Sequence, residues 1–536
     1  MRLTRRLAGL ALAAAAAMPF ALAPAPASAE TPPNMLVIAA TIDDIVSLDP
    51  QESFEFSGSD ILNNMYGSLV SFDPADLSKG YVPDIAESWE ISGDGKVYTF
   101  KIRDGLKFHS GNPVTAKDVE FSLRRAVAMK KTPSFILTQF GFTEDNMGET
   151  LVAVDDSTFQ LTTDKKYATS FVLNCLTATI AYIVDSETVK ANEQDGDWGN
   201  TWLKTNSAGS GAYKLVNWKP NEAYTLEANA DYWRGAPAMQ RVIVRHIPES
   251  ATQRLLLERG DVDIARNLNP EDIAAVEGAE GIAVDSDLRG RIMYFSMNQK
   301  HPILSKPKVR EALKYLADYE GMANSFLRGQ YTVHQAFLPL TYMGELKDQP
   351  YSLNVEKAKA LLAEAGHADG FEVEIIVRTA QERVEIAQTL QQNFAKAGIT
   401  ATISQATGKQ TLAKYRSREF DIYVGAWGPD YPDPHTNADT FSHNPDNSDE
   451  AGLTGKLAWR NGWDIPEMTA MTEAALVEGD REVRAQMYVD IQKEWQRTAP
   501  FVPMFQKIEQ IARRDSVSGF VTGSAITAAF YWSVTK

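Results

Sequence analysis

Residues Phe371–Ser404 read FEVEIIVRTAQERVEIAQTLQQNFAKAGITATIS, and this segment predicts the architecture of the domain that contains it. Apolar and polar residues alternate in Phe371–Arg378, as in a strand with one buried face. Apolar residues then recur at helical spacing over Glu382–Ala397, and Gly398 is a typical helix stop. Ile399–Ser404 alternates again. A helix that joins two strands in this way forms a parallel, right-handed crossover, which predicts an α/β domain.

The same pattern extends on both sides of this segment. Upstream, Asn354 is a suitable cap for a helix over Val355–Ala365, and Gly366 would end that helix. Downstream, a helix is predicted over Lys409–Arg418. The apolar run Phe420–Trp427, in FDIYVGAWGPDYPDP, then predicts a strand that is buried on both faces. The alternation of strands and helices continues through all of these elements.

The loop after this last strand is a candidate ligand site. It is rich in proline and carries Asp430 between Trp427 and Tyr431. Ligands of α/β sheets bind beyond the carboxyl ends of the strands. A carboxylate between two aromatic rings suits an ammonium group, because the carboxylate accepts a charge-assisted hydrogen bond and the rings exclude water and offer π faces to the cation. The alternative is an ordinary surface turn whose carboxylates cap the local backbone.

The earlier part of the chain has a different pattern. Val97–Ile102 alternates, Thr115 and Asp118 can cap a following helix, and the segments Leu151–Thr163 and Tyr213–Ala228 predict strand pairs. This arrangement is typical of a more antiparallel α+β region. A chain of 536 residues exceeds a single hydrophobic core, so we expect two or three domains.

The first residues are predicted to be a secretory signal peptide. Arginines at positions 2, 5 and 6 precede the apolar run Leu7–Leu22, and Ala27-Ser28-Ala29 is a small-residue cleavage signature. We therefore expect an exported, soluble, periplasmic protein that is cleaved near Ala29. The pair Arg5-Arg6 leaves both the general and the twin-arginine export routes open.

Charge and cysteine content limit the possible partners. The formal net charge is −17, which argues against nucleic acid or an anionic membrane surface as a partner. The single cysteine, Cys175, lies in an apolar run and cannot form an internal disulfide. We interpret it as a buried, unreactive thiol.

No enzymatic or metal-binding motif is present in the sequence. Gly-x-Ser-x-Gly, His-Glu-x-x-His and a phosphate-binding loop are all absent, so we predict that the protein is not an enzyme and has no cofactor. His435 and His443 follow the candidate loop, but no Cys or paired His accompanies them. They therefore predict no transition-metal cage, and the site prediction includes no metal.

Several ordered motifs resemble one family along nearly the whole mature chain. They are Ser47–Pro50, Tyr81–Ala126, Ser207–Leu215, Asp231–Trp233, Arg254–Ile264, Val309–Asp318 and Glu356–Gly366. Their order is similar to that of the family-5 extracellular solute-binding proteins of ABC importers, the dipeptide- and oligopeptide-binding group. The resemblance implies an α/β, two-lobed periplasmic-binding-protein fold with an extra N-terminal subdomain and a ligand cleft between the lobes.

The resemblance also implies a division of the chain. After a signal peptide at 1–29, residues 30–72, 190–291 and 504–536 would form lobe I. Residues 73–189 would form its subdomain, and residues 292–503 would form lobe II. The chain would then cross between the lobes twice, with hinge segments near Gly290–Asn298 and Pro500–Lys507. Closure about this hinge would bury the ligand.

Site residues follow from the same resemblance. Asp430 matches the aspartate that binds the α-amino group of a peptide, and Trp427 and Tyr431 match its aromatic neighbours. Val424 stands where tripeptide-binding relatives have a basic residue, and Ala426 replaces the usual glycine before the tryptophan. The length of the ligand, and even its peptide nature, are therefore left open.

Two further groups of residues are expected at the site. One is a segment whose backbone would pair with bound peptide as an added strand, formed by Phe54, Glu55 and Phe56. The other consists of the candidates for binding the ligand carboxylate, Arg378 and Arg383. Ordinary core packing of the phenylalanines and solvated arginines are the structural alternatives.

The expected partners are a peptide or peptide-like ligand and an inner-membrane ABC permease with its ATPase subunits. We expect a monomer. Relatives of this class also bind opines, sugar conjugates, nickel chelates and haem, so a non-peptide solute is an alternative ligand. A ligand sensor is a second alternative, because a closed clamp can contact a receptor instead of a permease.

Overall fold

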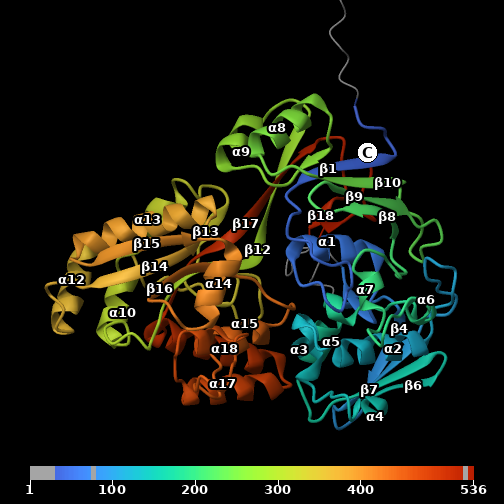
Figure 1. Ribbon diagram of the computed structural model, residues 1–536, viewed down its shortest axis with the longest axis horizontal. Coiled ribbons are helices and arrows are strands. Elements are labelled where there is room, and N and C mark those ends of the chain that lie inside the picture. Colours follow the sequence, from blue (N-terminus) through green and yellow to red (C-terminus); the bar gives the residue numbers. More distant parts are fainter. Residues whose placement is uncertain (1–29, 74–79, 523–528) are drawn as a thin grey trace, which may run out of the picture.

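The computed structural model describes residues 30–73, 80–522 and 529–536, so the predicted signal peptide lies outside the described residues. Figure 1 shows two bodies side by side, with the N-terminal half of the chain on the right and much of the C-terminal half on the left. The long strands β12 (Ile282–Met297) and β17 (Phe501–Arg514) run between them. This is a two-lobed α/β architecture.

One sheet of eleven strands extends through both lobes. Its order is β15-β14-β16-β12-β17-β11-β1-β10-β9-β8, and β13 pairs with β17. On the right, β1 pairs in parallel with β10 and β11, whereas β8, β9 and β10 are antiparallel. The elements of this part are β1 (Met35–Ala40), α1 (Phe56–Met65), β2 (Val70–Phe72), β3 (Tyr81–Pro83), α6 (Ser186–Ala191), α7 (Asn200–Leu203), β8 (Tyr213–Lys219), β9 (Ala223–Ala228), β10 (Arg241–His246), α8 (Ser250–Arg259), β11 (Ile264–Ala265), α9 (Pro270–Val276), β18 (Val521–Thr522) and β19 (Ala529–Phe530).

A second sheet, with four antiparallel strands, forms a separate layer at the lower right of Figure 1. Its order is β4-β5-β7-β6, and α2 contacts β6 and β7. Thr115 and Asp118 form the predicted capping box of α2, and the two predicted strand pairs are present. The elements are β4 (Ala86–Ile91), β5 (Val97–Ile102), α2 (Ala116–Ala128), α3 (Phe135–Thr138), α4 (Met147–Thr150), β6 (Leu151–Asp155), β7 (Thr158–Thr162) and α5 (Thr169–Leu176).

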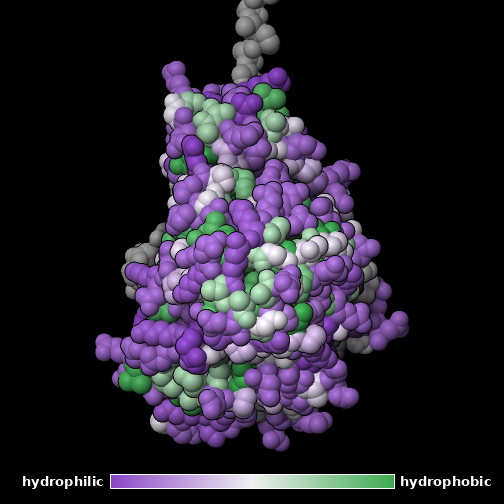
Figure 2. Space-filling view, turned by 90° about the vertical axis from the view of Figure 1, so that its left-hand side faces the viewer, coloured by the Kyte–Doolittle hydropathy of each residue, from purple (hydrophilic) through white to green (hydrophobic). Residues whose placement is uncertain are grey.

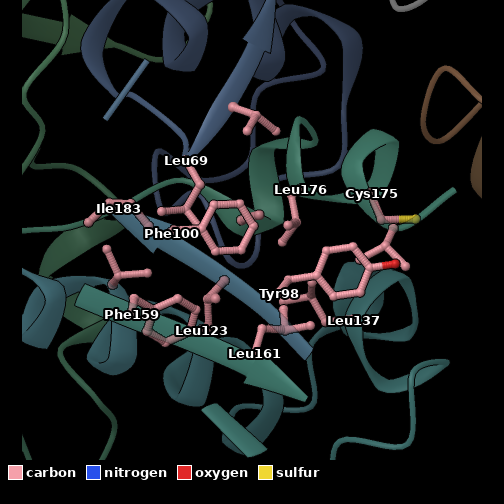
Figure 3. Packing of buried hydrophobic residues seen from close by; sticks show 14 of the residues in the cluster. Leu69, Tyr98, Phe100, Leu123, Leu137, Phe159, Leu161, Cys175, Leu176 and Ile183 are labelled. Carbon is pink, nitrogen blue, oxygen red and sulfur yellow. The ribbon is translucent and has the colours of Figure 1, made fainter. Parts of the chain in front are cut away.

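An aromatic and aliphatic core joins this four-stranded sheet to the helices around it. Figure 3 shows the buried side chains of Tyr98, Phe100, Phe159 and Leu176 within this core. Cys175 of α5 is fully buried in the same cluster, and burial raises the pKa of its thiol. The predicted burial of Cys175 is confirmed, and the raised pKa disfavours the thiolate, which is the reactive form.

The left lobe contains the predicted α/β unit. Strands β14, β15 and β16 are parallel, and β14 lies between the other two. Asn354 accepts a hydrogen bond from the Lys357 backbone at the start of α12, and Gly366 and Gly398 have positive φ angles after α12 and α13. The elements are α10 (Pro307–Lys314), α11 (Tyr319–Ala323), β13 (Tyr331–Val333), α12 (Val355–Glu364), β14 (Glu372–Arg378), α13 (Gln381–Lys396), β15 (Thr400–Ala406), α14 (Gly408–Arg416), β16 (Ile422–Trp427), α15 (Pro434–Phe441), α16 (Leu457–Arg460), α17 (Pro466–Val477) and α18 (Arg481–Thr498).

The pairing of β12 with β17 is irregular near its middle. Leu288 is opposite Ile508, but Ile292 is opposite Gln506, so residues 289–291 of β12 lie opposite the single residue Lys507. Such a bulge increases local twist and changes the direction of side chains. The regular ladder is therefore interrupted between the part of the strands in the right lobe and the part in the left lobe.

The surface is mostly polar on the face that Figure 2 shows. This view looks at the outer end of the left lobe, where hydrophobic residues form small groups among hydrophilic ones. Within residues 30–73, 80–522 and 529–536, no helix is both long and apolar enough to cross a membrane.

Candidate ligand site between the lobes

A cavity of about 390 Å³ lies between the lobes, beside the irregular part of β12 and β17. Phe56 and Asp60 of α1 contribute to it from the right lobe. Tyr331 of β13 and Glu382 of α13 contribute to it from the left lobe. Its wall thus combines elements that are far apart in the sequence, and a molecule inside it would contact both lobes.

Part of the charge in this cavity is neutralised internally. Arg266 forms an ion pair with Asp60, and its Nη2 lies 3.1 Å from Oε1 of Glu509. Arg289 Nε donates to Glu509 Oε2 at 2.7 Å. Burial acts to raise the pKa of Glu509, but the attraction of Arg266 and Arg289 is stronger and lowers it. These four groups form a network that fixes the strands beside α1.

Two other cations of the cavity wall lack such partners. In the part of the chain that the structure describes, no carboxylate lies within ion-pair distance of Arg291 or Lys507. The Arg291 guanidinium carbon lies 5.9 Å from the ring centre of Phe56, and Lys507 Nζ lies 4.6 Å from that of Tyr331. Burial, followed by repulsion from Arg291, lowers the pKa of Lys507 to about 8.

Asp430 occupies the loop after β16, as the sequence indicates. Its backbone N–H donates to Thr436 Oγ1 at 3.2 Å, and its side chain is half-buried. No ion pair of Asp430 is present among the described residues. Burial raises the pKa of this carboxyl to about 7, and the nearby Asp439 adds to the rise. A cation beside this carboxyl group would stabilise its ionised form, because the cation would replace the water that the group loses on burial.

The two predicted aromatic neighbours of Asp430 have different surroundings. Trp427 is half-buried, and its ring lies edge-on to Phe441 at 5.7 Å between ring centres. Tyr431 is 2% exposed and packs on Phe171 of α5 at 5.8 Å. The ring of Tyr431 therefore belongs to the contact between the lobe and the four-stranded-sheet layer, whereas Trp427 has surface left for a ligand.

Only part of the predicted peptide-pairing segment has an extended backbone. Glu55 is extended and precedes α1, but Phe56 is the first helical residue, so its backbone is not strand-like. Phe54 and Phe56 are 38% and 42% exposed. The Phe56 ring lines the cavity, and its Cζ lies 3.3 Å from the position that a Cβ on Gly428 would occupy. Phe56 thereby connects the cavity to the loop that carries Asp430.

The two candidate arginines are also separated. Arg378 is exposed and lies near Gly408 rather than in the cavity wall. Arg383 is 5% exposed on α13, and its Nε has no hydrogen-bond partner in the structure as described. Burial lowers the pKa of Arg383, and the charge of Arg291 lowers it further. The structure thus places Arg383, and not Arg378, near the unpaired cations.

Sequence reasoning missed Arg291 and Lys507 as candidates. Both lie in segments that otherwise read as buried strands, RIMYFSM and FQKIEQ, and a basic residue in such a run is a signal that could have identified them. The sequence pattern predicts only hinges in these segments. Their meeting at one cavity depends on strand pairing between residues more than 200 positions apart.

The histidines after the loop have protein partners. His435 is buried against Phe171, and burial lowers its pKa to about 4. His443 Nδ1 lies 2.7 Å from Asp439, and its Nε2 lies 3.2 Å from Glu473. Among the residues that the structure describes, no group of three or more His, Cys, Asp or Glu side chains could hold a metal ion.

The lobes also touch on the far side of the Asp430 loop. Asn174 of α5 donates to Asp433 at 2.9 Å, and Arg484 of α18 donates to Ser170 at 3.2 Å. Asp433 and Arg484 themselves form a buried ion pair at 2.7 Å. These contacts join the two sides of the molecule through α5 and the segment that follows Asp430.

Two lobes that meet around a charged cavity, joined by a pair of long strands, define a clamp-like solute-binding protein. Residues 80–449 match the family of bacterial extracellular solute-binding proteins, family 5 Middle. The chain belongs to this family.

Individual relatives bind different solutes. The chain is 28% identical to a probable D,D-dipeptide-binding periplasmic protein of Escherichia coli (strain K12), over 94% of each chain. It is 27% identical to haem-binding protein A of Haemophilus influenzae, over 87% of this chain and 86% of the relative.

Solved structures support the same fold. A periplasmic binding protein from Helicobacter pylori in complex with the peptide STSA has a TM-score of 0.79 at 24% identity, covering 94% of this chain and 98% of that one. A dipeptide-binding protein from Pseudoalteromonas sp. SM9913 in complex with Met-Leu also has a TM-score of 0.79, at 22% identity, covering 94% of this chain and 100% of the other. At these identities the likeness concerns the fold.

Proposed function

We propose that this protein is the periplasmic substrate-binding component of an ABC importer and that it captures di- or oligopeptides by hinge closure. The ligand would be held between the lobes and delivered unchanged to a membrane permease driven by its ATPase subunits. The protein would be a monomer without enzymatic activity, exported by a signal peptide that is cleaved near Ala29. Family membership and the peptide-binding relatives support this proposal.

The observation that carries the proposal is the state of Asp430. A half-buried carboxyl with a raised pKa and no ion pair among the described residues lies on the loop that follows β16. Asp430 does not itself line the cavity, but Gly428 of the same loop approaches Phe56, which does. A ligand ammonium would restore the interactions that this acid loses on burial. Trp427 would cover one side of that ammonium, and closure of the lobes would exclude water.

We also propose the division of the chain into lobe I (30–72, 190–291 and 504–536), its subdomain (73–189) and lobe II (292–503). The irregular pairing of β12 with β17 near residues 289–291 supports a hinge at this place. An interrupted ladder bends at lower cost than a regular one.

Identification of the bound molecule tests the proposal directly. The mature protein is purified from the periplasm and examined by native mass spectrometry, followed by denaturing release. Short peptides are the expected cargo. A haem, an opine or a metal chelate would keep the clamp but replace the substrate.

The role of Asp430 is tested by Asp430→Asn, with Asp446→Asn as the control. Asp446 is an exposed acid of the same lobe, so the control makes the same change in charge. Removing one partner of a buried charge pair costs on the order of 3–5 kcal/mol, so Asp430→Asn should weaken peptide binding by roughly a hundredfold or more. Calorimetric affinities that are equal for wild type and Asp430→Asn would refute the role of Asp430.

A further inference from the structure

A pair of cations in the hinge strands is exposed to the cavity without a carboxylate partner. Arg291 of β12 and Lys507 of β17 both line the cavity, and neither forms an ion pair with any residue that the structure describes. Unpaired charges in partly enclosed places are costly, and most proteins avoid them. Their retention beside a cavity therefore points to a function.

The bulge in β12 explains how the two cations meet. Residues 289–291 lie opposite Lys507, so Arg291 and Lys507 are cross-strand neighbours at one of the two points where the ladder is irregular. Both side chains line the same cavity, and repulsion from Arg291 adds to the effect of burial in lowering the pKa of Lys507. Two like charges at this separation repel, and an anion between them would turn that repulsion into attraction.

The acids of the cavity wall are already engaged elsewhere. Glu509 and Asp60 pair with Arg266 and Arg289. Glu382 lies 4.0 Å from Arg383, and Glu385 accepts a hydrogen bond from Gln381 at 3.2 Å. None of these acids lies within ion-pair distance of Arg291 or Lys507.

We propose that Arg291 and Lys507 form an anion subsite that binds a carboxylate of the solute, with Arg383 behind it as a further source of positive potential. Arginine binds a carboxylate through two parallel N–H···O bonds, and lysine adds a third donor from the facing strand. This inference rests on the proposed function, because it names the chemical class of the solute for the same cavity.

The position of the subsite defines the polarity of the solute. The Phe56 ring approaches both Arg291 and Gly428, and Gly428 lies two residues before Asp430. A solute held between the two ends would place its ammonium at Asp430 and its carboxylate at Arg291 and Lys507, with Phe56 between them. Such a site prefers a free zwitterion over a molecule whose carboxylate is blocked.

The subsite also lies on the hinge itself. A carboxylate that bridges Arg291 of β12 and Lys507 of β17 would contact both strands at the place where they bend. Binding energy from this contact depends on the relative position of the two strands, so it favours one hinge geometry over others. Binding of the carboxylate would thus also favour closure of the two lobes.

The test compares free dipeptides with the same dipeptides amidated at the C-terminus. Wild type, R291Q/K507Q and the charge-matched control R259Q/K219Q are incubated with each pool, and retention is measured by native mass spectrometry. Arg259 and Lys219 are exposed residues of the right lobe outside the cavity. Circular dichroism and thermal unfolding establish that the variants fold, and the single variants R291Q and K507Q replace the double variant if it does not.

Wild type and the control should retain the free acids roughly tenfold to a hundredfold better than the amides. In R291Q/K507Q this ratio should fall to about one, because the amide and the acid would then meet the same neutral wall. A ratio that stays unchanged in R291Q/K507Q would overturn the subsite, as would a wild type that retains both pools equally.

A second arm separates the subsite from the proposed function. If wild type retains neither pool, the peptide assignment fails, and thermal unfolding is then measured with acetate, succinate or phosphate. Stabilisation by acetate or succinate in wild type that is absent in R291Q/K507Q supports the carboxylate subsite without peptides. Equal stabilisation of both proteins, or stabilisation by phosphate alone, overturns it.

Discussion

At the scale of single residues, the protein keeps several charges in places where they are costly. Burial raises the pKa of Asp430 and lowers the pKa of Lys507, so in both residues it favours the uncharged form. Such residues are unfavourable for stability in the empty protein, and they become favourable when a counter-charge arrives. In the proposed binding site, relief of this unfavourable burial would contribute part of the binding free energy.

The pH dependence of binding should reveal Asp430. Because its pKa is about 7 when no ligand is bound, half of the molecules carry a neutral acid at that pH. An ammonium binds the ionised form, so affinity for a dipeptide should fall as pH decreases below 7, approaching roughly tenfold per pH unit. Isothermal titration calorimetry between pH 5.5 and 8 measures this change in affinity. The affinity of Asp430→Asn should not show the fall below pH 7.

The folding stability of the ligand-free protein should decrease as pH rises, whereas the affinity for a dipeptide should increase. The pKa of Asp430 rises from its ordinary value of 3.8 to about 7 on folding, so the folded state holds the proton more tightly. Its contribution to stability is complete below pH 3.8 and is lost as pH rises toward 7. At pH 8, ligand-free Asp430→Asn should unfold at a higher temperature than wild type, whereas Asp446→Asn should not.

At the scale of elements, the α/β unit depends on glycines at helix ends. A Cβ added to Gly370, which precedes β14, would collide with the carbonyl oxygen of Gly398 at the end of α13, and its φ is +80°. Gly366 has a similar φ of +81°, but nothing lies within 4 Å of its added Cβ. Alanine substitutions at the two positions would therefore share the backbone strain, and only the substitution at Gly370 would add a steric collision.

Gly370→Ala should therefore destabilise the protein more than Gly366→Ala. A non-glycine residue in the left-handed region costs about 1–2 kcal/mol, and this cost applies to both variants. Only Gly370→Ala adds a collision with backbone, which requires the strand and the helix end to separate. Urea unfolding measures the difference, and equal stabilities of the two variants would contradict the predicted close approach.

At the scale of the whole molecule, closure depends on contacts that the hinge brings together. Asn174 and Ser170 of α5 meet Asp433 and Arg484, and these contacts exist only when the two sides approach. The Asp433–Arg484 ion pair lies within one lobe, so it does not depend on contact between the two sides. Each contact across the gap thus changes the balance between open and closed forms.

Asn174→Ala should shift this balance toward the open form. The loss of the hydrogen bond to the charged Asp433 costs about 1.5–3 kcal/mol in the closed state, so peptide affinity should fall by roughly tenfold or more. The Tyr81 hydroxyl also donates to Asn174, but it keeps the carbonyl of Ser170 as an acceptor in the variant. Thr177→Ala is the control, because its hydroxyl bonds only within α5, to the carbonyl of Asn174. Small-angle scattering should report a larger radius of gyration for Asn174→Ala, and an unchanged radius and affinity would refute the latch.

Local pattern explains which features could be predicted. The α/β unit of Asn354–Trp427, the capping box of α2 and the burial of Cys175 all follow from residues that are close together in the chain. Helix caps, glycine stops and the spacing of apolar residues act within a few positions of one another. The location of Asp430 on the loop after β16 follows for the same reason.

The composition of the candidate site depends on distant pairing. Phe56, Arg291 and Lys507 reach one cavity because β12 pairs with β17 and α1 lies beside them. Tyr431 is adjacent to Asp430 in sequence, yet its ring packs on Phe171 of another layer. Adjacent residues can thus have unrelated roles, and residues of one site can come from opposite ends of the chain.

The sequence by itself determined the family, the order of strands and helices in the α/β unit, and the position of Asp430 on the loop after β16. Only the tertiary structure decided which cations remain unpaired, because ion pairing depends on distances across the sheet and not on spacing along the chain. Arg266 and Arg289 are neutralised by Asp60 and Glu509, whereas Arg291, one bulge away, lines the cavity without such a partner. Electrostatic energy depends on the separation of charges in space, and folding is what sets that separation.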